Sequence, residues 1–124
     1  MADKSDFSFE NLTVWQRAMD LVDAVYDLTE RWPRRELFGL TNQVRRAAVS
    51  IPSNIAEGQG RKSDTEFARF LTISLGSLME VRTQLLIGVR RKYSAAEQIG
   101  SASALANEVG KMLNGLYNRL KGKK

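Results

Sequence analysis

Apolar residues recur every three or four positions along most of the chain, and this spacing limits the fold more than any other feature. It places the apolar side chains along one side of an α-helix. Four segments show this spacing, and no segment shows the sustained alternation expected of a β-strand. The four apolar sets are Val14, Ala18, Leu21, Val25, Leu28 and Trp32; Leu37, Leu40, Val44, Ala47, Ile51 and Ile55; Phe67, Leu71, Ser74, Leu78, Val81 and Leu85; and Ile99, Ala102, Ala106, Val109, Leu113, Leu116 and Leu120.

Short polar segments separate the four patterns and predict where the helices end. The first should end before Pro33, because proline disfavours helical backbone in the residue that precedes it. Gly58 and Gly60 should end the second. Residues 63–66 and 94–97 both match the S/T-x-x-E/Q capping box, which predicts the starts of the third and fourth helices.

Connections this short make consecutive helices antiparallel, so we predict an all-α, antiparallel up-down-up-down four-helix bundle. A chain of 124 residues allows one such domain. We expect an N-terminal extension at residues 1–10, the bundle at 11–120 and a basic tail at 121–124. Further apolar residues lie off the four patterns. They predict either a homo-oligomer or a broader core, and the sequence leaves both open.

Cysteine and histidine are both absent, which excludes much chemistry. Disulfides, thiolate nucleophiles, the usual general base and the commonest metal ligands are all missing. We therefore predict no enzyme, no metal and no cofactor. An enzymatic alternative would need Glu57 and Glu66 to form a carboxylate pair across the connection between the second and third helices. No apolar run is long enough to span a membrane and no signal segment is present, so we expect a cytoplasmic protein.

The net charge is +5, and it is unevenly distributed. Residues 1–30 hold two basic and seven acidic side chains, whereas residues 31–124 hold 17 basic and seven acidic ones. A strongly basic body favours a polyanionic partner, with nucleic acid the leading candidate. The alternative is that these charges solvate helix surfaces.

The predicted topology gathers arginine and lysine at the two ends of the bundle. The start of the second helix and the end of the third should meet at one end, and the connection between these helices lies at the other. Guanidinium groups bind phosphate through paired hydrogen bonds. At the first of these ends, Trp32 and Tyr93 are weaker candidates for stacking on bases. The candidate nucleic-acid-binding residues are Arg34, Arg35, Arg61, Lys62, Arg90, Arg91 and Lys92.

The segment from Gly39 to Lys62 contains polar residues that helical periodicity does not explain. Pro52 lies inside the second pattern and should kink that helix. We predict that Arg45, Arg46, Asn54 and Glu57 form a polar network or a subunit interface. Glu57 would pair with Arg46 or with a neighbouring subunit, and Asn54 would bond the carbonyls released by Pro52.

Three sequence motifs resemble those of a known family. The chain has an L-x-V-W-Q opening at residues 12–16 and the central signature R-R-A-A-x-S-I-P-S-N-I-A-E-G at 45–58. An S-x-x-E-F-x-R-F-L-x-I-S-x-G-S motif follows at 63–77. Together they resemble the four-helix bundle proteins encoded in intervening sequences of bacterial 23S rRNA genes.

This resemblance implies a four-helix bundle that assembles into a ring-like homopentamer. The family is in turn similar to the accessory variability protein of diversity-generating retroelements, a basic pentameric bundle that partners a reverse transcriptase and nucleic acid. We predict a noncatalytic homo-oligomer that binds RNA or another nucleic acid electrostatically through its arginine-rich surface. The alternative is a protein-interaction scaffold that docks an acidic protein partner.

Overall fold

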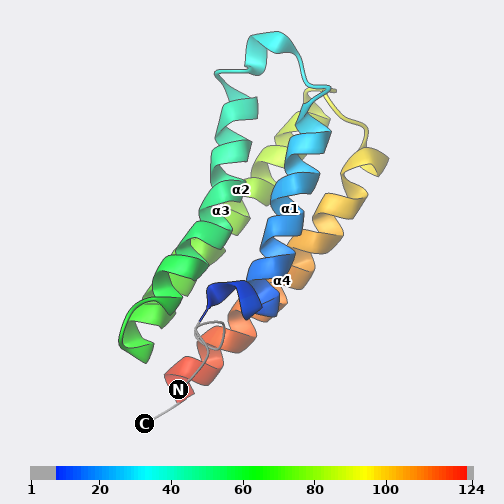
Figure 1. Cartoon of the computed structure of the whole chain (residues 1–124). Helices are drawn as coiled ribbons and strands as arrows, with labels where there is room; N and C mark the ends of the chain where they lie inside the picture. Colours follow the sequence, from blue (N-terminus) through cyan, green and yellow to red (C-terminus); the bar gives the residue numbers. More distant parts are fainter. Residues whose placement is uncertain (1–7, 123–124) are drawn as a thin grey trace.

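The computed structural model describes residues 8–122, and these residues form four α-helices and no strand. The chain reverses direction at each connection, so the helices run up, down, up and down (Figure 1). The predicted all-α four-helix bundle is therefore confirmed. The elements are η2 (Phe9–Asn11), α1 (Thr13–Thr29), η3 (Arg34–Glu36), α2 (Leu40–Gln59), α3 (Asp64–Arg90), η4 (Ala96–Ile99) and α4 (Gly100–Gly122).

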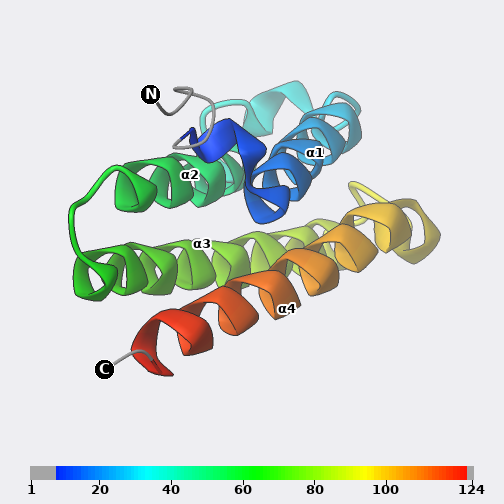
Figure 2. The same cartoon turned by 60° about the horizontal axis from the view of Figure 1, so that its bottom comes forward.

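Each helix packs against its neighbours in sequence, and α1 packs against α4 to close the bundle (Figure 2). The contact between α2 and α3 is the most extensive. Gly58 explains the close approach there, because a Cβ atom added to it would lie 2.6 Å from Cβ of Phe70. Further along, Ser74 Oγ donates a hydrogen bond of 2.9 Å to the carbonyl of Ile51. Small side chains thus let the two backbones approach closely.

The apolar patterns form the core almost as predicted. Nearly all of the predicted positions are buried, while Leu28, Leu40, Phe67 and Leu116 are partly buried against the core. Leu37 is the exception, with 45% of its surface exposed. The reason is that α2 begins only at Leu40, so Leu37 lies in the connection before the helix.

One predicted capping box is confirmed and the other is wrong. Ser63 Oγ accepts a hydrogen bond of 3.1 Å from the backbone N–H of Glu66 and caps α3. Ser94 does not cap the fourth helix, because its hydroxyl is buried and accepts a hydrogen bond from Trp32. Instead, η4 precedes α4, and the Gln98 side chain accepts from the backbone N–H of Ala95 at 2.7 Å.

The predicted domain boundaries shift by a few residues at each end. Ser8 caps η2, and the ring of Phe9 lies edge-on to Trp15 at 5.2 Å, so the last residues of the predicted extension pack on the bundle. Helix α4 continues through Gly122, two residues into the predicted basic tail. The rest of the extension and of the tail lies outside the described residues.

Helix α3 is the one helix within residues 8–122 that is long and apolar enough to cross a membrane. A core helix of a soluble bundle meets the same two conditions, so this is weak evidence for a membrane span. The buried side of α3 forms part of the bundle core, through residues such as Leu71, Leu78 and Leu85.

Candidate nucleic-acid interface

Trp32 fixes one end of the bundle. Its side chain is only 5% exposed, and its indole Nε1 donates a hydrogen bond of 2.8 Å to Oγ of Ser94. Gly88 of α3 lies directly against the ring, since a Cβ atom there would be 2.5 Å from it. Trp32 therefore joins the end of α1, the end of α3 and the connection to α4. Because the indole is buried, the prediction that it stacks on a base is wrong.

Glu36 and Tyr93 join η3 to the same end of α3. The Tyr93 hydroxyl donates a hydrogen bond of 2.7 Å to Oε2 of Glu36. Oε1 of Glu36 accepts one of 2.9 Å from the backbone N–H of Leu40 and caps α2. Tyr93 is half-buried, and its ring lies against Trp32 and under the guanidinium of Arg35. The ring is therefore partly covered by protein side chains, and its stacking on a base stays a prediction.

These contacts lower the pKa of Glu36 below its ordinary value. The hydrogen bond from the Leu40 N–H contributes most, followed by the bond from Tyr93, and both outweigh the opposing effect of desolvation. The charges of Arg35 and Arg91 lower the pKa further. Two arginines far apart in sequence thus act on one carboxylate, so η3 and the end of α3 lie together as predicted.

Five basic side chains of η3 and of the end of α3 gather at this end of the bundle, and we call this cluster the η3–α3 pole. All five of its cations are exposed, and within residues 8–122 no carboxylate lies within 4 Å of any of them. Lys92 has a φ angle of 67°, in the left-handed region, where the chain leaves α3. The pole therefore presents several cations that are free to meet an anionic partner. Its members are Arg34, Arg35, Arg90, Arg91 and Lys92.

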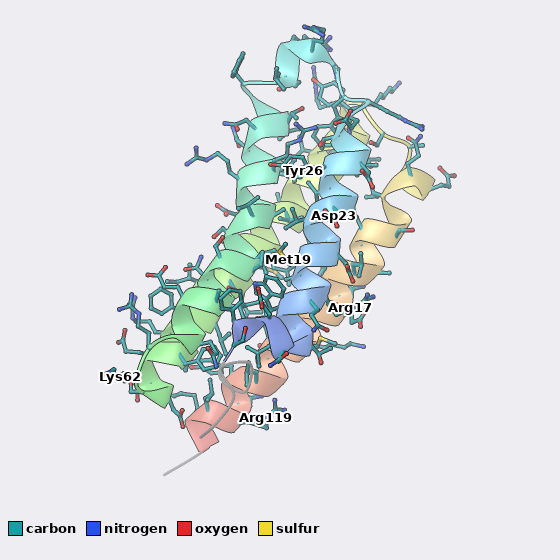
Figure 3. The ribbon with its side chains drawn as sticks, in the orientation of Figure 1. Arg17, Met19, Asp23, Tyr26, Lys62 and Arg119 are labelled. Carbon is teal, nitrogen blue, oxygen red and sulfur yellow. The ribbon has the colours of Figure 1, made fainter. Side chains whose placement is uncertain are left out.

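Arg61 and Lys62 lie at the opposite end of the bundle, in the connection between α2 and α3 (Figure 3). Arg61 pairs with Glu57 at 2.9 Å and its guanidinium lies 4.8 Å from the Phe70 ring centre, whereas Lys62 is exposed. Helix α3 has 27 residues, and at about 1.5 Å per residue it separates the two ends by about 40 Å. The two basic groups therefore do not form one continuous surface.

The predicted polar network is only partly correct. Arg45 does form one: its Nε donates to Oγ1 of Thr29 at 2.8 Å, and its guanidinium lies 4.6 Å from the ring centre of Tyr26. This holds α2 against the end of α1. Glu57 pairs with Arg61 one turn away rather than with Arg46, which lies about three turns earlier on the same helix.

Asn54 also bonds differently from the prediction. Pro52 lacks the N–H that would bond the carbonyl of Ala48, yet the Asn54 amide donates to the carbonyl of Ser50 at 2.8 Å and to its hydroxyl at 2.9 Å. The Ser50 hydroxyl in turn lies 2.8 Å from that of Ser77 in α3. Asn54 therefore belongs to a hydrogen-bonded chain that links α2 to α3.

The carboxylate pair required by an enzymatic alternative is replaced by two separate ion pairs. Glu57 bonds Arg61, and Glu66 bonds Arg69 at 3.2 Å. Each carboxylate therefore has its own arginine partner on its side of the connection between α2 and α3.

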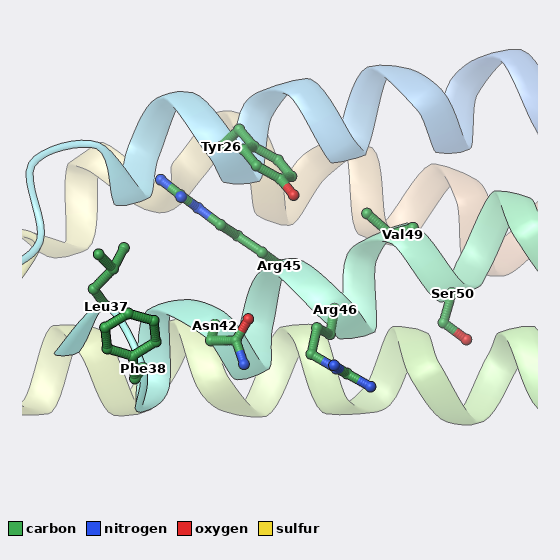
Figure 4. Close-up of a pocket in the computed structure, with 8 residues that line it drawn as sticks. All are labelled: Tyr26, Leu37, Phe38, Asn42, Arg45, Arg46, Val49 and Ser50. Carbon is green, nitrogen blue, oxygen red and sulfur yellow. The ribbon is translucent and has the colours of Figure 1, made fainter.

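Sequence reasoning missed a hollow of about 630 Å³ between α1 and α2 (Figure 4). Phe38 lies at the edge of this hollow, and 91% of its surface is exposed. The prediction extended the helical pattern back to Leu37, which hid the fact that residues 37–39 form a connection. The available signal was Phe38 itself, an aromatic residue off the apolar pattern and next to glycine. The lining residues are Tyr26, Leu37, Phe38, Asn42, Arg45, Arg46, Val49 and Ser50.

The hydrogen bond between Tyr93 and Glu36 makes the stability of the fold near the pole depend on pH. Since the pKa of Glu36 is lowered in the fold, its carboxylate stabilises the fold above the ordinary pKa of a glutamate. That contribution is lost as the pH falls through the lowered value. Replacing Tyr93→Phe removes one donor and should raise the Glu36 pKa toward its ordinary value, as measured by NMR titration of the side-chain carboxyl carbon. Tyr117→Phe in α4 is the matched control, and an equal shift in both variants would contradict the assignment.

Comparison with known proteins gives a family and a fold. Residues 10–115 match the family described as 23S rRNA-intervening sequence protein. A protein of unknown function from the S23 ribosomal protein family of Bacteroides thetaiotaomicron has a similar structure, with a TM-score of 0.76 and 23% identity over 85% of this chain and 98% of that one. No curated protein sequence matches the chain significantly. Because the family match covers most of its length, the chain belongs to the 23S rRNA-intervening sequence protein family.

Proposed function

We propose that this protein is a noncatalytic, homo-oligomeric bundle that binds RNA electrostatically, with the η3–α3 pole as a principal contact. The observation that carries the proposal is the gathering of five exposed cations, unpaired with any carboxylate in the described part of the chain, at one end of the molecule. Arg61 and Lys62 provide a second, smaller contact at the other end.

The chemistry of the pole suits phosphate. Four of its five cations are arginines, whose guanidinium groups are weakly hydrated and donate two parallel hydrogen bonds to an anionic oxygen pair. Glu36 is the acidic group among them, and its charge is already engaged by the Leu40 N–H and the Tyr93 hydroxyl. Cations held on fixed backbone at a helix end would contact the phosphates of a folded RNA by shape rather than by base sequence.

The family description refers to 23S rRNA, which makes an rRNA segment the first ligand to test. The resemblance to the accessory variability protein of diversity-generating retroelements points to the same class of ligand, and it stays a prediction. A cytoplasmic location, where RNA is accessible, is part of the proposal. The absence of any cofactor is also part of the proposal.

Self-association is supported by exposed apolar side chains on the outer side of α3. Met79 is 48% exposed and Leu86 58% exposed, and Ile73 and Ile87 also face solvent. Exposed apolar surface that runs along one helix is typical of an interface. A closed symmetric homo-oligomer would cover it, and the family resemblance suggests a pentamer.

Removing the pole cations should weaken RNA binding and its dependence on salt. A labelled 23S rRNA fragment is titrated with wild-type protein and with the Arg90→Ala, Arg91→Ala, Lys92→Ala triple variant at several salt concentrations. Loss of three phosphate contacts should reduce the slope of log affinity against log salt by about 2 to 3. The control is Lys111→Ala, Arg119→Ala, Lys121→Ala, which removes the same charge from α4, where Arg119 lies at the far end of the bundle (Figure 3).

The control triple variant in α4 should retain most of the slope of log affinity against log salt. An equal loss in both triple variants would show that net charge alone sets the affinity. If the wild type fails to bind RNA even at low salt, the proposal is overturned, and a scaffold that docks an acidic protein becomes the leading function.

Introducing charged side chains on the outer side of α3 should separate the subunits. In sedimentation velocity, the wild type should sediment as an assembly and the Met79→Glu, Leu86→Glu variant as a monomer near 13.9 kDa. The reason is that burying two unpaired carboxylates in an interface is strongly unfavourable. Asn107→Glu, Asn114→Glu places the same charges on exposed positions of α4 and should leave the assembly intact. A wild type that is monomeric at every concentration would contradict self-association.

A further inference from the structure

We propose that the hollow between α1 and α2 receives an unpaired base of the bound nucleic acid, which stacks on the ring of Phe38. This inference rests on the proposed RNA-binding function and adds a second kind of contact to it. Two of the residues that line the hollow are arginines and none is acidic. Arg45 lies 3.9 Å from the carboxylate of Glu30, so Arg46 supplies the unpaired charge. The hollow therefore offers both an aromatic surface and positive charge, the combination that single-stranded nucleic acids bind.

Phe38 is held on a well-bonded backbone. The N–H of Leu37 donates to the carbonyl of Arg34 at 3.0 Å, and the N–H of Gly39 donates to that of Glu36 at 2.9 Å. Glu36 also binds the first residue of α2. The backbone that carries the exposed ring is thus held in place before any ligand arrives, which reduces the entropy lost on binding.

Polar groups line the same hollow as the ring. Arg45 is held under Tyr26 by its bond to Thr29, while Asn42 and Arg46 line the hollow on the same side as Phe38 (Figure 4). No carboxylate in residues 8–122 lies within 4 Å of Arg46. An amide such as that of Asn42 can bond the edge of a base, and a free guanidinium can bond the adjoining phosphate. The volume of about 630 Å³ lies within the range of about 300–1,000 Å³ typical of small-ligand sites.

The hollow lies close to the η3–α3 pole along the chain. Only Glu36 separates Arg35 of the pole from Leu37 of the hollow, so an RNA bound at the pole can place its next unpaired nucleotide on the ring. A second hollow of about 380 Å³ lies between α2 and α3 and shares Asn42, Arg46 and Ser50 with the first.

That second hollow is suited to a base or a sugar hydroxyl. Besides amides, hydroxyls and Ala47, it is lined by one basic and one acidic side chain, Arg46 and Glu80, so it carries no net positive charge. Oε1 of Gln84 is buried there and has no hydrogen-bond partner among the described residues.

The test compares two probes that carry the same number of phosphates. One is a labelled single-stranded oligoadenylate of about twelve nucleotides, within the site sizes of single-strand-binding proteins. The other is its abasic counterpart. Wild-type protein should bind the oligoadenylate about tenfold more tightly than the abasic strand, and Phe38→Ala should abolish that difference while its affinity for the abasic strand is unchanged.

Phe38→Tyr keeps the ring and should keep the difference. Met19→Ala, which removes an exposed apolar side chain of α1 outside the hollow, should also keep it. Since both substituted side chains, Phe38 and Met19, are exposed, circular dichroism should show that the three variants fold like the wild type. The triple pole variant should weaken both probes alike, which separates the electrostatic contact from the stacking contact.

Three results would overturn the assignment. If the wild type binds both probes equally and Phe38→Ala changes nothing, the hollow holds no base, whereas the pole still binds phosphate. If Phe38→Ala weakens both probes alike and lowers the sedimenting mass, the ring belongs to an interface between copies of this chain. If the wild type binds neither probe nor the rRNA fragment, the proposed function fails together with this inference.

Discussion

The buried indole of Trp32 is the contact on which the candidate interface depends. It fills the space left by Gly88, hydrogen-bonds Ser94, and so fixes the ends of α1 and α3 relative to the connection before α4. The cations of the η3–α3 pole come from segments on either side of this contact. Without a rigid junction, arginines separated by more than fifty residues in sequence would not be held within reach of one partner. A bulky residue at Gly88 would displace the ring and separate the two basic segments.

The close approach of α2 and α3 provides the second constraint. Gly58, Ser74 and Ser77 are small where the helices meet, and the hydroxyls bond across the contact. This leaves the long polar side chains of α2 on its outer side, where Asn42 and Arg46 border both hollows. The sequence signature that resembles the family's includes Arg46, Ser50, Asn54 and Gly58. Its polar residues serve both to pack the two helices and to shape the surface beside them.

Apolar spacing predicted the four helices and most of the core because it depends only on local geometry and burial. Local patterns failed where a distant residue competed for the same group. Ser63 and Ser94 match the same capping pattern, but Ser94 is taken by the indole of Trp32. Glu57 was within reach of Arg61 on the next turn, which a pairing with Arg46 could not match. The position of Phe38 could not be predicted from periodicity, because it depends on α2 beginning at Leu40, where Glu36 caps the helix.

The central claim is that nucleic acid contacts the η3–α3 pole and the segment that leads from it into α2. Ultraviolet crosslinking of the wild-type protein to a 23S rRNA fragment, with the modified peptides identified by mass spectrometry, tests it most directly. The account predicts crosslinks concentrated in residues 34–46 and 90–93, with few on α4. Crosslinks confined to α4, or spread evenly over all four helices, would contradict it.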